Sequence, residues 1–284
     1  METIRLPRVM QDTAIKERAR GRSIGFVPTM GALHEGHMAL MRAARAENDL
    51  VAASIFVNPS QFSRGEDFER YPRDLASDME KLTKEDVDLL FLPDTAAIYP
   101  NGFSSRLDVN GLSEKLCGAW RPGHFKGVAT VVLKLLNLLS PTRAYFGQKD
   151  YQQSLVIRRL VKDLNLTPEI VVCPTVREED GLAMSSRNAY LSPPERKAAG
   201  VLYRALTAGA AKAKETRRAE EVKEAIHGVL RSEPLVSEVQ YASAYDPETL
   251  DEPETLKGPA ALLAGAVVIG RARLIDNLIL NDLK

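Results

Sequence analysis

The chain has 284 residues, and 44% of them are apolar, a composition typical of folded globular proteins that excludes disordered and fibrous classes. Its 38 Lys and Arg balance 38 Asp and Glu, so no overall charge attracts a nucleic acid, and we expect no nucleic-acid partner. The two cysteines, Cys117 and Cys173, lie far apart and form no zinc or disulfide pattern, which favours a reducing, cytoplasmic location.

The sequence also predicts no membrane partner. Residues 1–10 lack the apolar stretch of a secretory signal. The most apolar later run covers residues 258–270, which is shorter than the ~20 residues that span a bilayer. We therefore expect a protein that does not enter the membrane.

The first half of the chain alternates short apolar segments with helical ones. Residues 23–29 are rich in Ile, Phe and Val, as in a buried strand, and residues 37–48 carry Ala, Leu and Met at helical spacing. This alternation predicts an α/β fold with a Rossmann-like, doubly wound parallel sheet and helices on both faces. The other predicted strands are 51–57, 87–92, 143–146 and 169–173, and the other predicted helices are 74–84, 126–139 and 151–163.

Beyond Pro174 the pattern changes. Residues 193–214 and 219–231 are typical of helices rich in Ala, Lys, Arg and Glu, with no apolar strand between them. Residues 236–244 and 261–279 are strand-like, and their spacing favours a small antiparallel sheet. We therefore predict two domains, one over residues 1–176 and a smaller C-terminal α+β domain over residues 177–284.

The turn after the first predicted strand contains His34-Glu35-Gly36-His37, at the sheet edge where α/β proteins bind ligands. Two imidazoles three positions apart at a helix start lie on one face, beside first-turn N–H groups and the positive end of the helix dipole. This arrangement favours phosphate binding, and a plain helix cap is the alternative. A zinc site is disfavoured because the motif needs His at i and i+4, so no metal ligand is predicted.

Two later segments carry further groups suited to phosphate. The segment Phe146-Gly147-Gln148-Lys149-Asp150 follows a predicted strand, so Lys149 lies at a strand end and can neutralise phosphate charge. The segment Met184-Ser185-Ser186-Arg187-Asn188 has no regular periodicity, and its hydroxyls and guanidinium suit a mobile clamp on a triphosphate. Taken singly, each segment is more typical of an ordinary solvated loop or turn.

Together these elements resemble the paired signatures of the nucleotidyltransferase superfamily, and within it the sequence closely resembles the pantothenate synthetases, or pantoate–β-alanine ligases. One position departs from the family pattern, because Gln148 stands where the family's phosphate loop has glutamate, which puts in doubt only contacts of that side chain. The resemblance extends over about residues 20–195 and is carried by Pro28–His37, Phe56–Phe62, Tyr71–Arg73, Arg121–Phe125, Tyr145–Gln153 and Met184–Asn188.

The resemblance implies roles for individual residues. His34 and His37 would be catalytic, with His37 as the proton donor near the phosphates. Gln61 and Gln153 would bind pantoate, and Gln61 would also face β-alanine. Val176 would meet the adenine through its backbone. The ATP-binding residues that it implies are Met30, Gly31, Ala32, Leu33, His34, Glu35, Gly36, His37, Gly147, Gln148, Lys149, Asp150, Val176, Met184, Ser185, Ser186 and Arg187.

The implied reaction joins pantoate to β-alanine through a pantoyl-adenylate, releasing AMP and pyrophosphate in pantothenate and coenzyme A biosynthesis. Residues 1–176 would bind nucleotide and pantoate, and residues 177–284 would act as a lid. Mg²⁺ would accompany ATP, and the protein would be a homodimer. Two alternatives are a transferase that stops after nucleotidyl transfer and a catalytically silent nucleotide-binding module. Consumption of β-alanine together with release of AMP distinguishes the three.

Overall fold

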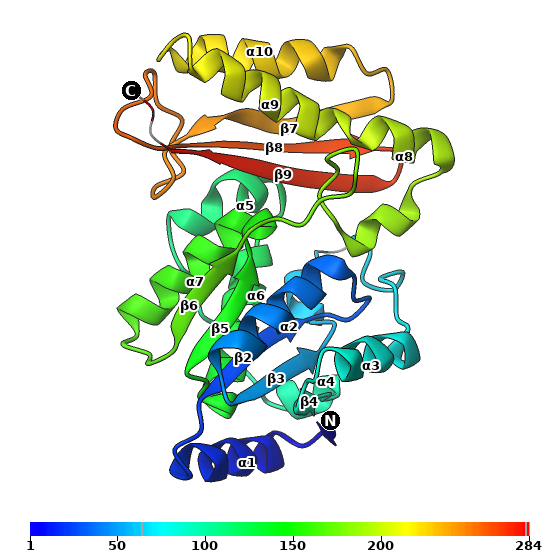
Figure 1. Cartoon of the computed structure of the whole chain (residues 1–284), viewed down its shortest axis with the longest axis vertical. Helices are drawn as coiled ribbons and strands as arrows, with labels where there is room; N and C mark the ends of the chain where they lie inside the picture. The colour runs from blue at the N-terminus through cyan, green and yellow to red at the C-terminus, as the bar shows by residue number, and fades with distance from the viewer. Residues whose placement is uncertain (64, 282, 284) are drawn as a thin grey trace. The chain divides into compact units, whose positions relative to one another are not determined.

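The computed structural model describes every residue except Arg64, Asp282 and Lys284 (Figure 1). The chain forms two compact units, and two short pieces of the chain before Pro174 belong to the second unit. The division into one domain over residues 1–176 and a second over residues 177–284 remains a prediction. Unit 1 comprises Met1–Glu114, Arg121–Gln148 and Gln152–Pro174, and unit 2 comprises Lys115–Trp120, Lys149–Tyr151 and Thr175–Lys284.

Unit 1 is built on a six-stranded parallel sheet with the order β1-β4-β3-β2-β5-β6. The chain moves outward from β2 through β3 to β4 and later returns to β5 on the other side of β2, so the sheet has a switch point between β2 and β5. This Rossmann-like order confirms the predicted doubly wound fold. The strands are β1 (Glu2–Ile4), β2 (Ile24–Thr29), β3 (Leu50–Ile55), β4 (Leu89–Phe91), β5 (Arg143–Gly147) and β6 (Glu169–Cys173).

Strand β2 is buried on both faces. Val27 packs in one apolar cluster with Met41, whereas the alternate residues Ile24 and Phe26 are fully buried as well. A central parallel strand therefore needs a continuous apolar run, which is the pattern that predicted it. Close packing also favours glycine at position 25, because a Cβ there would lie 2.6 Å from Nδ2 of Asn48.

Helices surround this sheet. Helix α2 contacts β2, β3 and β5, and α6 contacts α1 and β2. The sequence analysis did not predict β1 or α1, because α1 is mostly polar and buries only Met10, Ala14 and Glu17. The helices of unit 1 are α1 (Pro7–Ala19), α2 (Glu35–Glu47), α3 (Leu75–Lys84), α4 (Thr95–Ile98), α6 (His124–Leu139) and most of α7 (Tyr151–Asp163), with 3₁₀ turns η1 (Pro59–Gln61), η2 (Leu112–Glu114) and η3 (Gln148–Asp150), the last of which ends in unit 2.

Unit 2 contains the predicted antiparallel sheet, with the order β7-β8-β9. Helix α9 packs on β8 and β9, and α10 packs on β7. The single helix predicted over residues 193–214 is wrong in one respect, because it is interrupted at Gly200, a poor helix former. The elements of unit 2 are α5 (Leu116–Trp120), η4 (Ser186–Tyr190), α8 (Pro193–Ala199), α9 (Val201–Ala213), α10 (Ala219–Arg231), β7 (Val236–Tyr245), β8 (Ala261–Ile269) and β9 (Ala272–Leu280).

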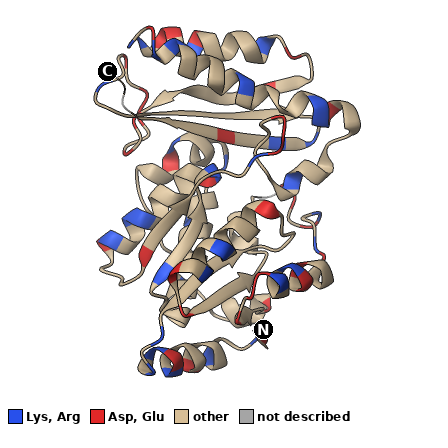
Figure 2. Ribbon diagram, in the orientation of Figure 1, with Lys and Arg blue, Asp and Glu red and all other residues tan. Residues whose placement is uncertain are grey.

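Charges of both signs are interspersed on the helices of each unit, as Figure 2 shows for α3 and α10. Opposite charges placed close together on one helix largely cancel each other's field at a distance. Among the helices of the described residues, none is both long and apolar enough to cross a bilayer.

Candidate active site

The turn between β2 and α2 is held by two reciprocal histidine hydrogen bonds. His34 is the N-cap of α2, and its Nδ1 accepts the Gly36 N–H at 3.2 Å, while Nδ1 of His37 accepts the His34 N–H at 3.2 Å. The two ring centroids lie 4.1 Å apart. A nitrogen that accepts carries no proton, so each neutral ring has its proton on Nε2. Capping and donation to a phosphate therefore use different nitrogens, and the two interpretations of this motif are compatible.

A carboxylate from α3 holds the loop that precedes these histidines. Gly31 and Ala32 both have left-handed backbones, with φ of +81° and +51°. Asp78, which is only 2% exposed, accepts the Ala32 N–H at 2.8 Å and the Leu33 N–H at 2.7 Å. Lys81 donates to the Leu33 carbonyl at 2.6 Å. The sequence analysis missed Asp78, whose only signal was a polar residue four positions before the buried Leu82 of its helix.

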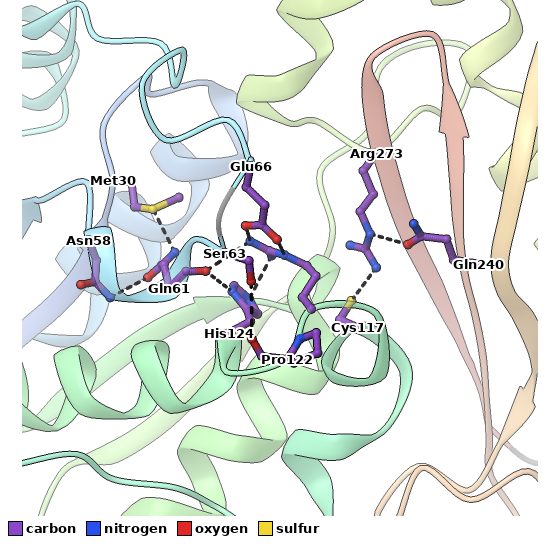
Figure 3. A network of polar contacts seen from close by, with 11 residues as sticks. Met30, Asn58, Gln61, Ser63, Glu66, Cys117, Pro122, His124, Gln240 and Arg273 are labelled. Atoms are coloured by element: carbon purple, nitrogen blue, oxygen red, sulfur yellow. Dashed lines mark hydrogen bonds and ion pairs between the residues drawn. The ribbon is translucent and has the colours of Figure 1, made fainter.

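The side-chain amide of Gln61 is held on both sides at the end of β3 (Figure 3). Its Oε1 accepts from Asn58 at 3.1 Å, and its Nε2 donates to the Met30 sulfur at 3.0 Å. Asn58 is buried, and its Oδ1 accepts from the hydroxyls of Ser60 at 2.8 Å and Tyr99 at 2.7 Å. Two predicted residues, Met30 and Gln61, thus contact each other directly, and Asn58, to which the sequence analysis assigned no role, orients the Gln61 amide.

The main chain of Gln61 is fixed by the start of α6 (Figure 3). His124 Nδ1 donates to the Gln61 carbonyl at 2.8 Å, and Arg121 lies 3.2 Å from the other ring nitrogen of His124. Arg121 also forms two hydrogen bonds with the Glu66 carboxylate, at 2.8 and 2.6 Å. Burial acts to raise the pKa of Glu66, but the hydrogen bonds and charge of Arg121 outweigh it and lower that pKa. This ion pair therefore helps to hold the main chain of Gln61 against the start of α6.

Helix α7 begins with two glutamines in different surroundings. Gln152 is buried and donates to the Leu112 carbonyl at 2.8 Å, so its amide serves the fold. Gln153 is half-buried at the next position. Because β3 and β5 flank β2 in a parallel sheet, Gln61 and Gln153 follow strand ends at the same sheet edge as the histidines.

Lys149 lies in η3 directly after β5, and its side chain is 20% exposed. Its Nζ is 3.9 Å from a carboxylate oxygen of Asp150. Its carbonyl accepts from Nδ2 of Asn277 at 3.0 Å. Lys149 lines one small pocket of unit 2 together with Ser185 and Tyr203. The structure therefore brings the predicted lysine close to the predicted serine-containing segment, while Gly147 and Gln148 end β5 and begin η3 in unit 1.

The segment from Val176 to Tyr190 contains a hairpin and a short 3₁₀ helix that the sequence analysis did not predict. Val176 and Met184 form the base of a hairpin, with the Met184 N–H donating to the Val176 carbonyl at 3.0 Å. Residues Ser186–Tyr190 form the 3₁₀ helix η4, capped by Ser185, whose hydroxyl accepts the Arg187 N–H at 3.3 Å. The non-periodic sequence did not predict this short 3₁₀ helix, whose first turn is stabilised by the Ser185 hydroxyl cap. The mobility of the segment stays a prediction.

The two cysteines are buried and form no disulfide. Within unit 2, Sγ of Cys117 lies 3.3 Å from the guanidinium of Arg273, which also donates to Gln240 at 2.7 Å (Figure 3). Over the residues that the structure describes, no three or more His, Cys, Asp or Glu side chains are grouped so as to hold a metal ion.

Comparison with known proteins gives matches over nearly the whole chain. The family model for pantoate-beta-alanine ligase matches residues 2–279. A pantothenate synthetase of Thermodesulfovibrio yellowstonii is 57% identical over 280 residues, which cover 99% of this chain and 100% of that relative.

Solved structures agree with this match. The pantothenate synthetase of Thermus thermophilus has a TM-score of 0.93 and 49% identity, covering 98% of this chain and 99% of that one. The pantoate-beta-alanine ligase of Francisella tularensis, complexed with beta-gamma ATP and β-alanine, has a TM-score of 0.81 and 37% identity, covering 98% of this chain and 97% of that one.

Proposed function

The chain belongs to the pantoate-beta-alanine ligase family and is an enzyme that ligates pantoate and β-alanine with ATP, and we propose that it works through a pantoyl-adenylate. The pantoate carboxylate first attacks the α-phosphorus of ATP, and pyrophosphate leaves. The β-alanine amine then attacks the mixed anhydride, and AMP leaves. Adenylation is needed because a carboxylate is a poor electrophile and requires a better leaving group.

The observation that carries this proposal is the reciprocal capping of His34 and His37. Because each ring accepts through Nδ1, each neutral ring presents an Nε2 proton at the positive end of α2. Donors fixed in this way stabilise the charge that develops on phosphoryl oxygens in the first step. We assign His37 as the principal donor and His34 as its partner, with Met30–Gly36 completing this part of the ATP site.

Gln61 and Gln153 are proposed to hold pantoate, and Gln61 also to face β-alanine. An amide donates to hydroxyl or carboxylate oxygens without adding a charge that would overbind the anionic ground state. The bonds from Asn58 and to Met30 support this role, because they fix the orientation of the Gln61 amide before substrate binds. A preoriented amide positions the attacking carboxylate at little entropic cost.

The residues of unit 2 are proposed to bind the remainder of ATP. Lys149 would neutralise phosphate charge, Ser185, Ser186 and Arg187 would bind the triphosphate, and Val176 would meet the adenine through its backbone. Gly147, Gln148, Asp150 and Met184 would contact the nucleotide beside them. We further propose that the segment 184–188 closes over the nucleotide and keeps water from the anhydride until the amine arrives.

Mg²⁺ is proposed to enter with ATP, where it would shield the attacking carboxylate from phosphate charge. The described site residues offer imidazole, lysine and hydroxyl groups rather than a carboxylate cluster, which fits a metal carried by the nucleotide. A homodimer and a cytoplasmic location are likewise proposed, the latter on the two free thiols.

The test is isotope exchange. With ATP, Mg²⁺ and pantoate alone, the enzyme should exchange labelled pyrophosphate into ATP, since none of the groups assigned to the first step requires β-alanine. Addition of β-alanine should then yield pantothenate and AMP. Exchange that appears only with β-alanine present, while pantothenate is still made, would replace the two-step scheme by an amine-gated or concerted one. Transfer without amine consumption would favour a nucleotidyltransferase instead.

A further inference from the structure

Two adjacent polar residues of β9, Asp276 and Asn277, are almost completely buried, with exposures of 4% and 2%. Successive residues of a strand point to opposite faces, so burial of both requires polar partners on both sides. Buried polar side chains cost free energy unless such partners are present. The partners here are residues that lead to the proposed ATP-binding groups of unit 2.

Asn277 holds the main chain at Lys149. Its Nδ2 donates to the Lys149 carbonyl at 3.0 Å, across 128 positions of sequence. Lys149 lies in a single 3₁₀ turn between β5 and α7, and a turn of this length fixes few of its own backbone groups. The bond from Asn277 therefore determines where the lysine side chain begins.

Asp276 holds the hairpin that leads to Met184. Its carboxylate accepts two hydrogen bonds from Arg177, at 2.6 and 2.9 Å. The same guanidinium donates to the Gly181 carbonyl at 3.0 Å, at the hairpin turn, and lies 4.2 Å from the ring centroid of Tyr203. One arginine thus ties both ends of the hairpin to β9, and a forked guanidinium fixes direction as well as distance.

We propose that Asn277 and Asp276 are positioning residues of the ligation reaction: Asn277 places Lys149, and Asp276, through Arg177, places the hairpin 176–184. The proposal rests on the proposed function of Lys149 and of the segment 184–188 in ATP binding. Neither residue of β9 is assigned a contact with substrate. A buried polar pair that costs free energy is retained because it sets the geometry of two ATP-binding elements at once.

The first test substitutes Asn277→Asp, which keeps the side-chain shape but replaces the amide donor by a carboxyl group that repels the Lys149 carbonyl when it is ionised. We expect KM for ATP to rise about tenfold, the effect of one lost hydrogen bond at a positioned group, with little change in KM for pantoate. In a Lys149→Ala background the same substitution should add almost nothing, because the placed ammonium is gone. Asn277→Ala repeats the test with a smaller side chain.

The matched control is His227→Ala. His227 donates from α10 to the Ala242 carbonyl at 2.9 Å. The control substitution therefore also removes one side-chain hydrogen bond to a backbone carbonyl of unit 2. It should lower the melting temperature without changing KM for ATP. Circular dichroism establishes that each variant is folded before kinetics are compared.

The second arm substitutes Arg177→Lys, which keeps the charge beside Asp276 and loses the fork. KM for ATP should rise severalfold, and amide exchange in residues 177–188 should quicken. Unchanged KM values in both Asn277→Asp and Arg177→Lys, or effects of Asn277→Asp and Lys149→Ala that simply add, would overturn the proposal. Failure of both Asn277 variants to fold would also overturn it, because Asn277 would then be a folding residue. If Lys149→Ala alone leaves ATP kinetics unchanged, the proposed function of Lys149 fails first.

Discussion

One arginine–carboxylate pair in unit 1 and one in unit 2 have similar geometry, yet the net shift of the carboxylate pKa is downward in the first and upward in the second. In unit 1, Arg121 and Glu66 have side-chain exposures of 14% and 22%, and the arginine lowers the pKa of Glu66 against the effect of burial. In unit 2, Arg177 and Asp276 have exposures of 18% and 3%, and burial raises the pKa of Asp276 despite the arginine.

The difference shows that burial of the carboxylate, rather than the presence of its partner, decides the sign. Residual solvent around Glu66 limits the free-energy cost of burying its charged form, so attraction to Arg121 outweighs that cost. Asp276 has lost nearly all of its hydration, and the same type of partner does not restore it. The Arg177–Asp276 pair therefore fixes local geometry but lowers stability when Asp276 is ionised. The Arg121–Glu66 pair fixes local geometry and also raises stability.

The largest expected effect is that of Arg177→Ala. It leaves the Asp276 carboxylate, which is 3% exposed, without its partner, and an unpaired buried charge typically costs about 3–5 kcal/mol of unfolding free energy. The matched variant Arg121→Ala should cost about 1 kcal/mol, because the Glu66 carboxylate is 22% exposed and keeps access to water. Urea denaturation measures both. Equal losses in the two variants would break the comparison, since depth of burial would then not matter.

His37→Ala comes next and tests the set of residues in unit 1. We expect kcat to fall about 10²–10³-fold, the usual effect of removing a donor to developing phosphoryl charge, with KM for ATP little changed. Loss of the cap should cost about 1 kcal/mol of stability. His37→Gln should restore the cap, because Gln at this helical position accepts the N-cap N–H, without restoring the ring donor. A folded His37→Ala enzyme with near-normal turnover would remove His37 from the catalytic residues.

Lys149→Ala tests the set of residues in unit 2 and should act on binding. KM for ATP should rise roughly tenfold or more, because one phosphate charge loses its partner. The matched control is Lys84→Ala, whose side chain is 70% exposed and pairs with Glu80 on α3. That variant should leave both kinetics and stability within measurement error. A large melting shift in Lys149→Ala with unchanged KM would instead favour an ordinary loop.

The same contrast explains what could be predicted from the sequence. His34 and His37 were found because they follow a strand end and are held by neighbours within three positions, whereas Gln61 was assigned only through the family resemblance. Asp276 and Asn277 were not found, since their partners lie 99 and 128 positions away. Their only signal was a polar pair inside the apolar run from Leu274 to Ile279, which places one polar residue on each face of the strand.

The fold shows the same division. Strands β2 to β6 were predicted because buried parallel strands need continuous apolar runs. Strand β1 and helix α1 were missed because three residues and a mostly polar helix carry little periodicity. Pairing with β4 decides the structure of β1, and contact with α6 decides that of α1.

The smallest expected effect is on the pH dependence of stability, where the two pairs should have opposite slopes. The folded-state pKa of Glu66 lies below its usual 4.5, so its contribution is complete above pH 4.5 and is lost as pH falls through the folded value. The folded-state pKa of Asp276 lies above its usual 3.8, so its contribution is complete below pH 3.8 and declines as pH rises through the folded value.

Unfolding free energies measured from pH 3 to pH 7 therefore separate the two pairs. The wild-type protein should gain stability over Glu66→Gln as pH rises, because the ionised Glu66 is bound by Arg121 only in the folded state. The advantage of the wild-type protein over Asp276→Asn should instead shrink as pH rises, because ionisation of Asp276 carries the cost of burial in the folded state alone. Parallel slopes would mean that the two carboxylates have similar hydration, and the greater burial of Asp276 would then no longer explain why its arginine fails to lower its pKa.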